Sequence, residues 1–251
     1  RIQDVATARH AIATGKLDMV GMTRAHIADP HIVRKVMEGR EHQIRPCVGA
    51  TYCLDRIYMA GEALCIHNAA TGRELTMPHV IEPAATARRV LVVGAGVGGL
   101  EAARVAAERG HRVTVLEAMP WPGGQLRLAA RNTRRRDLLG IVEWRVSELE
   151  RLGVDVRYDT FADADAIDAL TPDVVIIATG GLPQNPPIEA GGDLMVNAWD
   201  VVGGDARLTG DAVLCDDDGT HSAMTTAEML ARSGARVEIV TPERTMGGDV
   251  G

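Results

Sequence analysis

The sequence lacks the long hydrophobic runs, the aromatic residues and the excess of basic charge that mark several protein classes. Its longest apolar runs, 90–93 and 174–178, are far shorter than the roughly 18 residues that span a bilayer, so no membrane partner is expected. Aromatic residues make up 3% of the chain and the net charge is −7, which argues against nucleic acid as a partner. The arginine-rich stretch at 131–136 is interpreted as a solvated loop.

Cysteine is also scarce, with four residues in the chain, and the sequence shows no secretory signal pattern. Both features argue against a disulfide-rich secreted domain, and we expect a cytoplasmic protein. Cys47, Cys53 and Cys65 nevertheless lie close together, just before a Gly-rich motif. Thiolates beside a nucleotide-binding fold are typical of an electron-transfer centre. Cys215 lies on an expected strand and is predicted to be a small buried hydrophobic residue.

The ends of the chain suggest that it is part of a larger protein. Arg1 stands where an initiator Met would be, and Gly251 follows shortly after a strand-like run. Hydrophobic residues make up 46% of the chain, which is enough to bury a core. We therefore expect a soluble fragment whose function belongs to its parent.

Hydrophobic periodicity divides the chain into distinct segments. Near the start, one strand is expected between two helices: 5–14, 17–22 and 31–38. Residues 41–87 are rich in Pro and Gly and predict a loop-rich module and linker. From residue 88, strands and helices alternate as in a βαβ unit: strands 90–93, 112–117, 154–158 and 173–178, with helices 100–109 and 137–152. A similar unit follows, with strands 212–215 and 236–240 around helix 223–233.

The sequence Gly-Ala-Gly-Val-Gly-Gly that begins at Gly94 has G-x-G-x-x-G spacing and lies between an expected strand and helix. Gly94 permits a tight turn, Gly96 lets the backbone approach a pyrophosphate, and Gly99 allows close helix packing. Gly98 lies beside them, and the helix N-terminus supplies partial positive charge. Glu117, at the end of the next strand, is expected to hold a pair of ribose hydroxyls. Together these residues predict a dinucleotide-binding domain.

Two further turns are expected to contribute to the same site. The Gly-Gly-Gln sequence containing Gly124 and Gln125 is interpreted as backbone that faces an extended dinucleotide. Ala178, Thr179 and Gly180 form a strand-end turn near the phosphates. Each turn is a weak signal alone, because Gly pairs usually mark plain turns. The first of them favours FAD over ADP as the bound nucleotide.

The order of these motifs resembles the old-yellow-enzyme-related iron-sulfur flavoprotein family, which includes trimethylamine dehydrogenase, 2,4-dienoyl-CoA reductase and N-methylproline demethylases. The similarity covers essentially the whole chain. It implies an α/β protein that starts with the C-terminal end of an FMN-binding TIM barrel at 1–46 and continues with an iron-sulfur module and linker at 47–87. An FAD- or ADP-binding Rossmann-like domain at 88–185 and the start of a second, degenerate nucleotide-binding-like domain at 186–251 would follow.

The segment from Asp18 to Pro30 resembles the last barrel strand of this family and the turn that follows it. The resemblance implies that Gly21 and Arg24 help to hold the FMN phosphate. A strand-end turn before a helix is a plausible phosphate cradle at the C-terminal face of a barrel. From the residues alone, Arg24 in a surface salt bridge is the alternative.

The resemblance also implies four cysteine ligands of a 4Fe-4S cluster. Three of the four positions carry cysteine: Cys47, Cys53 and Cys65. The position of the second ligand is Ala50, whose methyl group cannot bind iron. Three outcomes stay open: a four-iron cluster with water or another residue on one iron, a three-iron cluster, or three buried thiols alone. We expect a retained cluster, because the cysteine spacing is kept, and interpret nearby Tyr52 and His67 as packing or hydrogen-bonding residues.

The second βαβ-like unit has Asp216, Asp217 and Asp218 where a pyridine-nucleotide domain needs glycines. Three carboxylates near a helix start would repel a diphosphate, so NAD(P)H binding is not expected here. The carboxylates are interpreted as charge partners of the helix N-terminus. In the family, reductases keep the glycine fingerprint at this point, whereas amine dehydrogenases resemble this sequence in having lost it.

The resemblance therefore implies an FMN- and iron-sulfur-dependent amine dehydrogenase or N-demethylase. A small amine would reduce FMN, and electrons would pass through the cluster to an external acceptor such as an electron-transferring flavoprotein. An NAD(P)H-dependent 2,4-dienoyl-CoA or enoate reductase is the alternative enzyme. A noncatalytic flavin- or nucleotide-binding electron carrier is the alternative class. Catalytic residues are expected on barrel strands outside this chain, so none is named.

Overall fold

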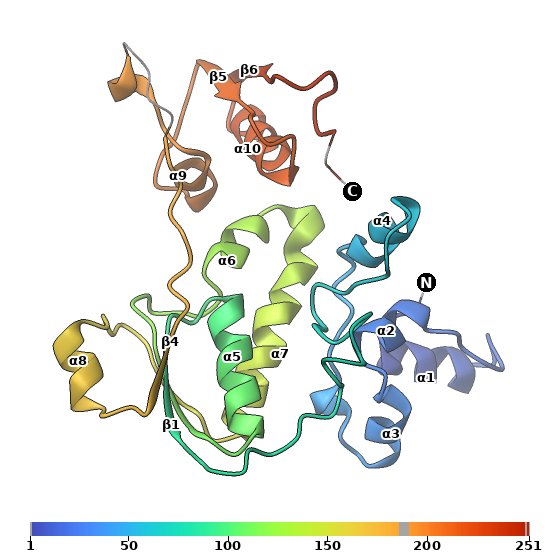
Figure 1. Ribbon diagram of the computed structural model, residues 1–251. Coiled ribbons are helices and arrows are strands. Elements are labelled where there is room, and N and C mark those ends of the chain that lie inside the picture. Colours follow the sequence, from blue (N-terminus) through green and yellow to red (C-terminus); the bar gives the residue numbers. More distant parts are fainter. Residues whose placement is uncertain (1, 186–190, 249, 251) are drawn as a thin grey trace. The chain divides into compact units, whose positions relative to one another are not determined.

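The computed structural model describes residues 2–185, 191–248 and 250, and the chain divides into two compact units (Figure 1). The first unit contains residues 1–126 and 137–180, and the second contains residues 127–136 and 181–251. Within the described ranges, no helix is both long and apolar enough to cross a membrane. Each unit has a hydrophobic core of its own.

A four-stranded parallel sheet forms the centre of the first unit (Figure 1). Its strands lie in the order β3 (Asp155–Arg157), β2 (Arg112–Leu116), β1 (Arg89–Val93) and β4 (Val174–Ile177). All four were expected from the sequence, because apolar runs bounded by turn residues are typical of buried parallel strands. The predicted α/β class with a parallel sheet is confirmed.

Two long helices cover one face of this sheet. Val92 and Val115 point to that face and are fully buried against α5 (Val97–Glu108) and α7 (Gly140–Arg151). The predicted helix 137–152 begins later than expected, because a 3₁₀ segment, η2 (Thr133–Leu139), precedes α7. The position of α5 matters most for function, since the Gly-rich turn leads directly into it.

The other face of the sheet is covered by a short helix. Leu91 and Leu116 are buried there, with Ile167 of α8 (Ala164–Ala169) packed against them. Along β1, neighbouring residues alternate between the two faces, as expected of an extended strand. Layers of this kind place loops at the carboxyl ends of the strands, where ligands of open parallel sheets bind.

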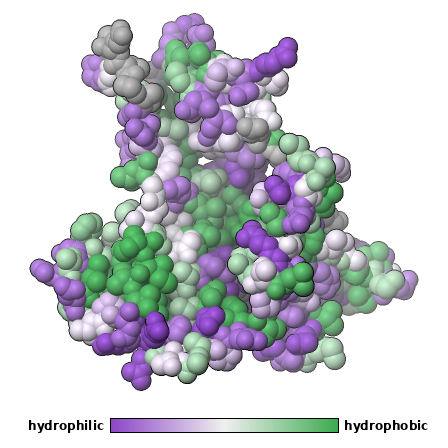
Figure 2. Space-filling model, in the orientation of Figure 1, coloured by the Kyte–Doolittle hydropathy of each residue, from purple (hydrophilic) through white to green (hydrophobic). Residues whose placement is uncertain are grey.

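Strand β4 forms one edge of the sheet and pairs only with β1 among the strands that the structure describes. Two of its apolar side chains are partly uncovered, Val175 at 39% and Ile177 at 66% of full exposure. Figure 2 shows hydrophobic surface gathered over this part of the first unit, beside α8. A continuous apolar run such as that of β4 is typical of a parallel strand that is covered on both faces of the sheet.

The segment before the sheet is helical and irregular. Its elements are α1 (Val5–Ala13), α2 (Thr23–Ala28), α3 (Ile32–Met37), the 3₁₀ turn η1 (Glu41–Gln43) and α4 (Tyr52–Tyr58). The strand predicted at 17–22 is wrong, since these residues form no strand and Met19 is 85% exposed. A strand is stable only when another strand pairs with it, and the described residues place none beside this segment.

The second unit is a smaller α/β assembly. Strands β5 (Asp211–Cys215) and β6 (Arg236–Val240) pair in parallel and pack with α10 (His221–Arg232) and α9 (Ala198–Gly203). The remaining short elements are α6 (Gln125–Ala129) and the 3₁₀ turn η3 (Gly192–Leu194). The prediction that Cys215 is buried is wrong. Every second residue of β5 is exposed, and Cys215 points to the uncovered face of this two-stranded sheet.

Candidate functional site

The Gly-rich turn after β1 is built on very close backbone contacts. Gly94 has a φ of 102°, and its N–H donates to the carbonyl oxygen of Leu116 at 2.8 Å. A Cβ atom on Gly94 would lie 2.4 Å from the carbonyl oxygen of Ala178 and 3.2 Å from the nitrogen of Thr179. The turn after β1 therefore touches the end of β4, which brings two of the predicted segments together.

The other glycines of the motif divide into two groups. A Cβ atom on Gly99 would lie 1.9 Å from the carbonyl oxygen of Gly94, so the fold itself requires glycine there. Gly96 and Gly98 would meet nothing within 4 Å. Gly96 precedes the first residue of α5, so its open side faces the place where a phosphate group would meet the helix N-terminus.

The predicted Gly-Gly-Gln turn lies against the same loop. Gly123 forms a parallel β-bridge with Gly96, and a Cβ atom on Gly124 would lie 3.3 Å from the Cα of Gly96. A Cβ atom on Gly180 would lie 3.6 Å from Nε2 of Gln125. Residues from three distant parts of the sequence thus converge at the carboxyl ends of β1 and β4. This is where a dinucleotide is expected in an open parallel sheet.

Glu117 follows β2 and points back at the Gly-rich loop. Its Oε2 accepts a hydrogen bond from the Ala95 N–H at 2.6 Å, and its Oε1 accepts one from the Met119 N–H at 2.8 Å. An ionised carboxylate has about four acceptor positions, so two remain after these bonds. Glu117 is thereby fixed in orientation and can still accept hydrogen bonds from two ribose hydroxyls.

Arg24 lies on α2, where the sequence predicts a phosphate cradle. Its Nη1 atom is buried and has no hydrogen-bond partner, and no carboxylate forms a salt bridge with it in the ranges described. The nearby Gly21 has open space around its Cα. A buried guanidinium nitrogen without a partner fits an anionic ligand such as a phosphate, whereas the alternative of a surface salt bridge is not supported.

The three cysteines form one electrostatically coupled group of free thiols. Burial raises the pKa of Cys53, and negative charge on Cys47 and Cys65 raises it further, while the N–H of Leu54 acts in the opposite direction. Cys53 lies in the first turn of α4. Three free thiols in one short module have the donor chemistry of an iron-sulfur ligand set.

The loop between Cys47 and Cys53 places Ala50 between two residues with positive φ, Gly49 at 68° and Thr51 at 58°. Among the His, Cys, Asp and Glu residues within the described ranges, no three are arranged to hold a single metal ion. A cluster differs from a single ion, because each thiolate binds a different iron atom and the sulfurs need not converge on one point.

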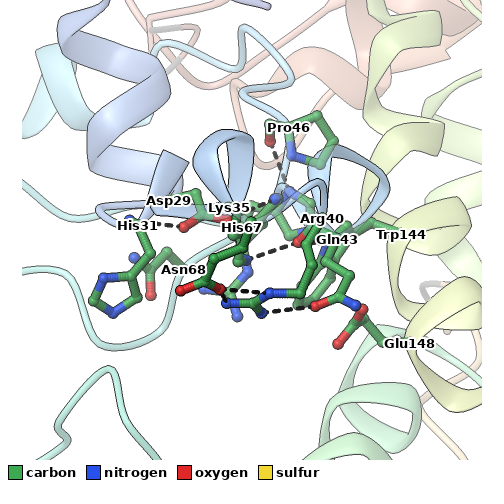
Figure 3. A network of polar contacts seen from close by, with 12 residues as sticks. Asp29, His31, Lys35, Arg40, Gln43, Pro46, His67, Asn68, Trp144 and Glu148 are labelled. Carbon is green, nitrogen blue, oxygen red and sulfur yellow. Dashed lines mark hydrogen bonds and ion pairs between the residues drawn. The ribbon is translucent and has the colours of Figure 1, made fainter. Parts of the chain in front are cut away.

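His67 packs inside the cysteine module, and its buried Nε2 has no hydrogen-bond partner among the residues described. Its Nδ1 donates to the carbonyl oxygen of Pro46 at 2.9 Å, and its ring meets Trp144 edge-on at 5.3 Å (Figure 3). Burial lowers the pKa of His67 to about 3, with the positive charge of Arg145 acting in the same direction. Its backbone N–H donates to Sγ of Cys65 at 3.4 Å. His67 thus makes the packing and hydrogen-bonding contacts that the sequence predicts.

Asp29 fixes the backbone that leads to the first cysteine. Its carboxylate accepts hydrogen bonds from Nζ of Lys35 at 2.6 Å, from the Arg45 N–H at 2.9 Å and from the His31 N–H at 3.0 Å (Figure 3). Burial alone would raise its pKa, but the hydrogen bonds with Lys35 and Arg45 outweigh burial and lower it. Asp29 is therefore ionised at neutral pH and orients the chain two residues before Cys47.

Trp144 of α7 anchors the cysteine module to the nucleotide-binding sheet. Its Nε1 donates to the carbonyl oxygen of Gln43 at 3.1 Å (Figure 3). The guanidinium of Arg45 stacks 4.4 Å from its ring centre. Sequence analysis missed this anchor. A signal existed, because Trp144 and Arg145 fall on the buried stripe of α7 that Ile141 and Leu149 define.

Replacing Trp144 with phenylalanine is expected to destabilise the protein by about 1–2 kcal/mol. The ring keeps most of its packing, but the Gln43 carbonyl oxygen loses one of its two donors and keeps only Nζ of Lys35. Chemical denaturation of the full-length protein measures the loss, with Trp144→Ala as the more severe comparison. Equal stability of wild type and Trp144→Phe would contradict the anchoring role.

In the second unit, carboxylates fill the turn between β5 and α10. Asp216 is 3% exposed, and its Oδ1 accepts a hydrogen bond from the Gly219 N–H at 3.0 Å. Asp218 accepts bonds from both the N–H and the hydroxyl of Thr220 at 2.9 Å. Backbone N–H groups that would bind a pyrophosphate in a pyridine-nucleotide domain are thus already bound to carboxylates.

Comparison with known proteins agrees with this geometry. The profile described as pyridine nucleotide-disulphide oxidoreductase matches residues 60–142. The chain is 60% identical over 250 residues to a probable N-methylproline demethylase from Rhizobium meliloti, an alignment that covers 100% of this chain and 37% of that protein. Over essentially its whole length the chain is similar to old-yellow-enzyme-related oxidoreductases. The resemblance predicted from the order of motifs is confirmed.

Other relatives show the same similarity. A multifunctional alkene reductase/demethylase OYE from Caballeronia cordobensis is 50% identical over 239 residues, covering 95% of this chain and 35% of that protein. The solved structure of 6-hydroxypseudooxynicotine amine oxidase from Pseudomonas geniculata N1 superposes with a TM-score of 0.88 at 30% identity, covering 96% of this chain and 38% of that one. The chain thus spans little more than a third of the length of these old-yellow-enzyme relatives.

Proposed function

We propose that this chain is the electron-relay part of an amine dehydrogenase or N-demethylase, which oxidises a small secondary or tertiary amine. The carboxylate-filled turn between β5 and α10 carries this proposal, because it disfavours NAD(P)H as the source of electrons. The names of the relatives, which include a probable N-methylproline demethylase, support an amine as the source instead.

Each cofactor has residues in this chain that fit it. Arg24, with its unpartnered buried nitrogen, would hold the FMN phosphate at α2. When bound, FMN would accept a hydride from the carbon next to the amine nitrogen. Gly96 leaves room for a pyrophosphate at α5, and Glu117 would orient the ribose of FAD or ADP. These residues bind and orient the cofactors, while the substrate would contact parts of the protein outside this chain.

The three cysteines would hold an iron-sulfur cluster between the two nucleotide sites. The charges of Cys47 and Cys65 act on Cys53, which supports this assignment. Ala50 stands at the place of the fourth ligand, so water or another group would complete the coordination of one iron. The cluster would allow electrons to leave one at a time toward an external acceptor, and an electron-transferring flavoprotein is the acceptor that we propose. We also propose that the domains of this chain end at residues 46, 87 and 185.

Anaerobic reduction of the full-length protein tests the direction of electron flow. We expect N-methylated amines such as N-methylproline to bleach the flavin absorbance within turnover time, and NADPH to leave it unchanged over the same period. Rapid bleaching by NADPH without bleaching by any N-methylated amine would overturn the proposal. That result would favour the reductase alternative, which the Caballeronia relative's name includes.

A further inference from the structure

We propose that Arg145 is a positioning residue that holds a fixed positive charge beside the cysteine group and thereby favours the reduced state of its cluster. The inference rests on the cluster of the proposed function. Arg145 lies on α7, in the nucleotide-binding part of the chain, whereas the cysteines precede it by about 80 residues or more. Nothing in the sequence spacing indicates that the two regions interact.

The Arg145 guanidinium is held from three sides inside the first unit. Its side chain is 3% exposed, its Nε forms an ion pair with Oε2 of Glu101 at 2.9 Å, and its Nη1 donates to the Ile141 carbonyl oxygen at 3.1 Å. Its Nη2 donates to the carbonyl oxygen of His67 at 3.3 Å. The two hydrogen bonds and the ion pair fix the charge in one place, because a planar guanidinium held by several contacts has little freedom to turn.

The contact with His67 places this charge next to Cys65. The His67 N–H donates to Sγ of Cys65 at 3.4 Å, so one peptide segment touches both the thiol and the guanidinium. Burial lowers the pKa of Arg145. The negative charges of Glu101 and of a Cys65 thiolate act in the opposite direction without outweighing burial. The Arg145 charge therefore acts electrostatically on the Cys65 sulfur across one peptide segment.

The surrounding charges leave an excess of positive charge in this region. Arg104 and Arg145 share Glu101, whose pKa is about 2 because the hydrogen bond and charge of Arg104 outweigh the effect of burial. Arg104 also pairs with Glu108. Arg45 stacks on Trp144 and has no carboxylate within salt-bridge distance among the residues described. Buried cations need a compensating anion, and a thiolate-bound cluster supplies one.

This arrangement has a direct consequence for electron transfer. Reduction adds one electron to the cluster and no proton, so the cluster becomes more negative. A fixed positive charge stabilises that added electron, whereas the partly neutralising carboxylate of Glu101 opposes it. Glu101 lies on α5, two residues after Gly99, so the same ion pair links the cysteine module to the helix of the dinucleotide loop.

Potentiometric titration of the full-length protein, followed by electron paramagnetic resonance of the cluster, tests the inference. At a fixed potential, Arg145→Gln is expected to lower the ratio of reduced to oxidised cluster about tenfold, which equals a fall of about 59 mV in midpoint potential. Glu101→Gln is expected to raise that ratio. Arg145→Lys keeps the charge and should change the ratio by less than about threefold.

Arg151→Gln is the matched control, since it removes the same charge from α7 at a partly exposed side chain that pairs with Glu148. It should leave the midpoint potential as in the wild type. An unchanged potential in Arg145→Gln, or a fall in Glu101→Gln, overturns the inference while the proposed function stands. Wild-type protein without iron and sulfide overturns the cluster and this inference together. If Arg145→Gln does not fold, the opposite shift in Glu101→Gln and the retained potential of Arg145→Lys decide the matter.

Discussion

Alanine in place of Gly99 is expected to destabilise the protein by about 3 kcal/mol or more and to abolish retention of the adenine nucleotide. The new Cβ atom would lie 1.9 Å from the carbonyl oxygen of Gly94, so the helix α5 must move away from the turn. Neither partner is the end of a flexible side chain, and the contact cannot relax locally. Denaturation midpoints and the flavin or ADP content of purified full-length protein measure the two effects.

Two neighbouring glycines serve as controls for this change. Gly98→Ala meets nothing within 4 Å and lies in α5, where alanine is favoured over glycine by up to about 1 kcal/mol, so stability and nucleotide content should be preserved. Gly96→Ala also meets no protein atom, but its methyl group would project where the pyrophosphate is proposed. We expect Gly96→Ala to fold normally and to lose the nucleotide.

The pattern across the three variants distinguishes folding from binding. Full nucleotide retention by Gly96→Ala would show that the ligand does not approach the backbone there. Normal stability of Gly99→Ala would contradict the packing of α5 against the turn. Each result is read from a different measurement, so failure of one prediction does not obscure the other.

Replacing Cys53 with alanine is expected to remove all inorganic sulfide and iron from the full-length protein, since a site that already lacks one thiolate has none to spare. Cys215→Ala is the control, because Cys215 is exposed on β5 in the second unit. It should leave the iron content unchanged. Iron and acid-labile sulfide analysis after anaerobic purification measures the effect.

Ala50→Cys tests the same site in the opposite direction. The added thiol lies at the place of the missing ligand, on the loop between Gly49 and Thr51, and is expected to make the cluster lose iron more slowly in air. A variant with the same rate of iron loss as the wild type would indicate that another group already holds the fourth position. Retention of full iron content by Cys53→Ala would exclude Cys53 as a ligand.

The sequence predicted the dinucleotide loop well because its requirements are local. Gly99 is needed by a backbone contact with Gly94 within one βαβ unit, and Glu117 follows the next strand at a fixed distance. The strands of the first sheet were recognisable for the same reason, since buried parallel strands are short apolar runs. The strand predicted at 17–22 shows the limit of this approach. A pattern of apolar residues forms a strand only where a partner strand lies beside it.

The charged network around Trp144 was not predicted, because it depends on contacts between segments far apart in the sequence. Arg45 and Arg145 meet the same indole ring from two different parts of the chain. The sequence did contain one indication of this network. Charged residues on the buried stripe of α7 interrupt its apolar pattern, and buried charges need partners. Cys215 was misread for a related reason, since a strand pattern does not reveal whether the second face of a two-stranded sheet is covered.

The uncovered edge of β4 has a practical consequence for anyone who produces this stretch alone. Unpaired backbone amides and carbonyls beside apolar side chains such as Ile177 are a template onto which a second copy can add its own strand. The isolated protein is therefore expected to dimerise or precipitate through the edge strand β4 as its concentration rises. The substitution Ile177→Lys would place a positive charge at this edge and oppose such self-assembly. It would leave the Gly-rich turn that follows the neighbouring strand β1 intact.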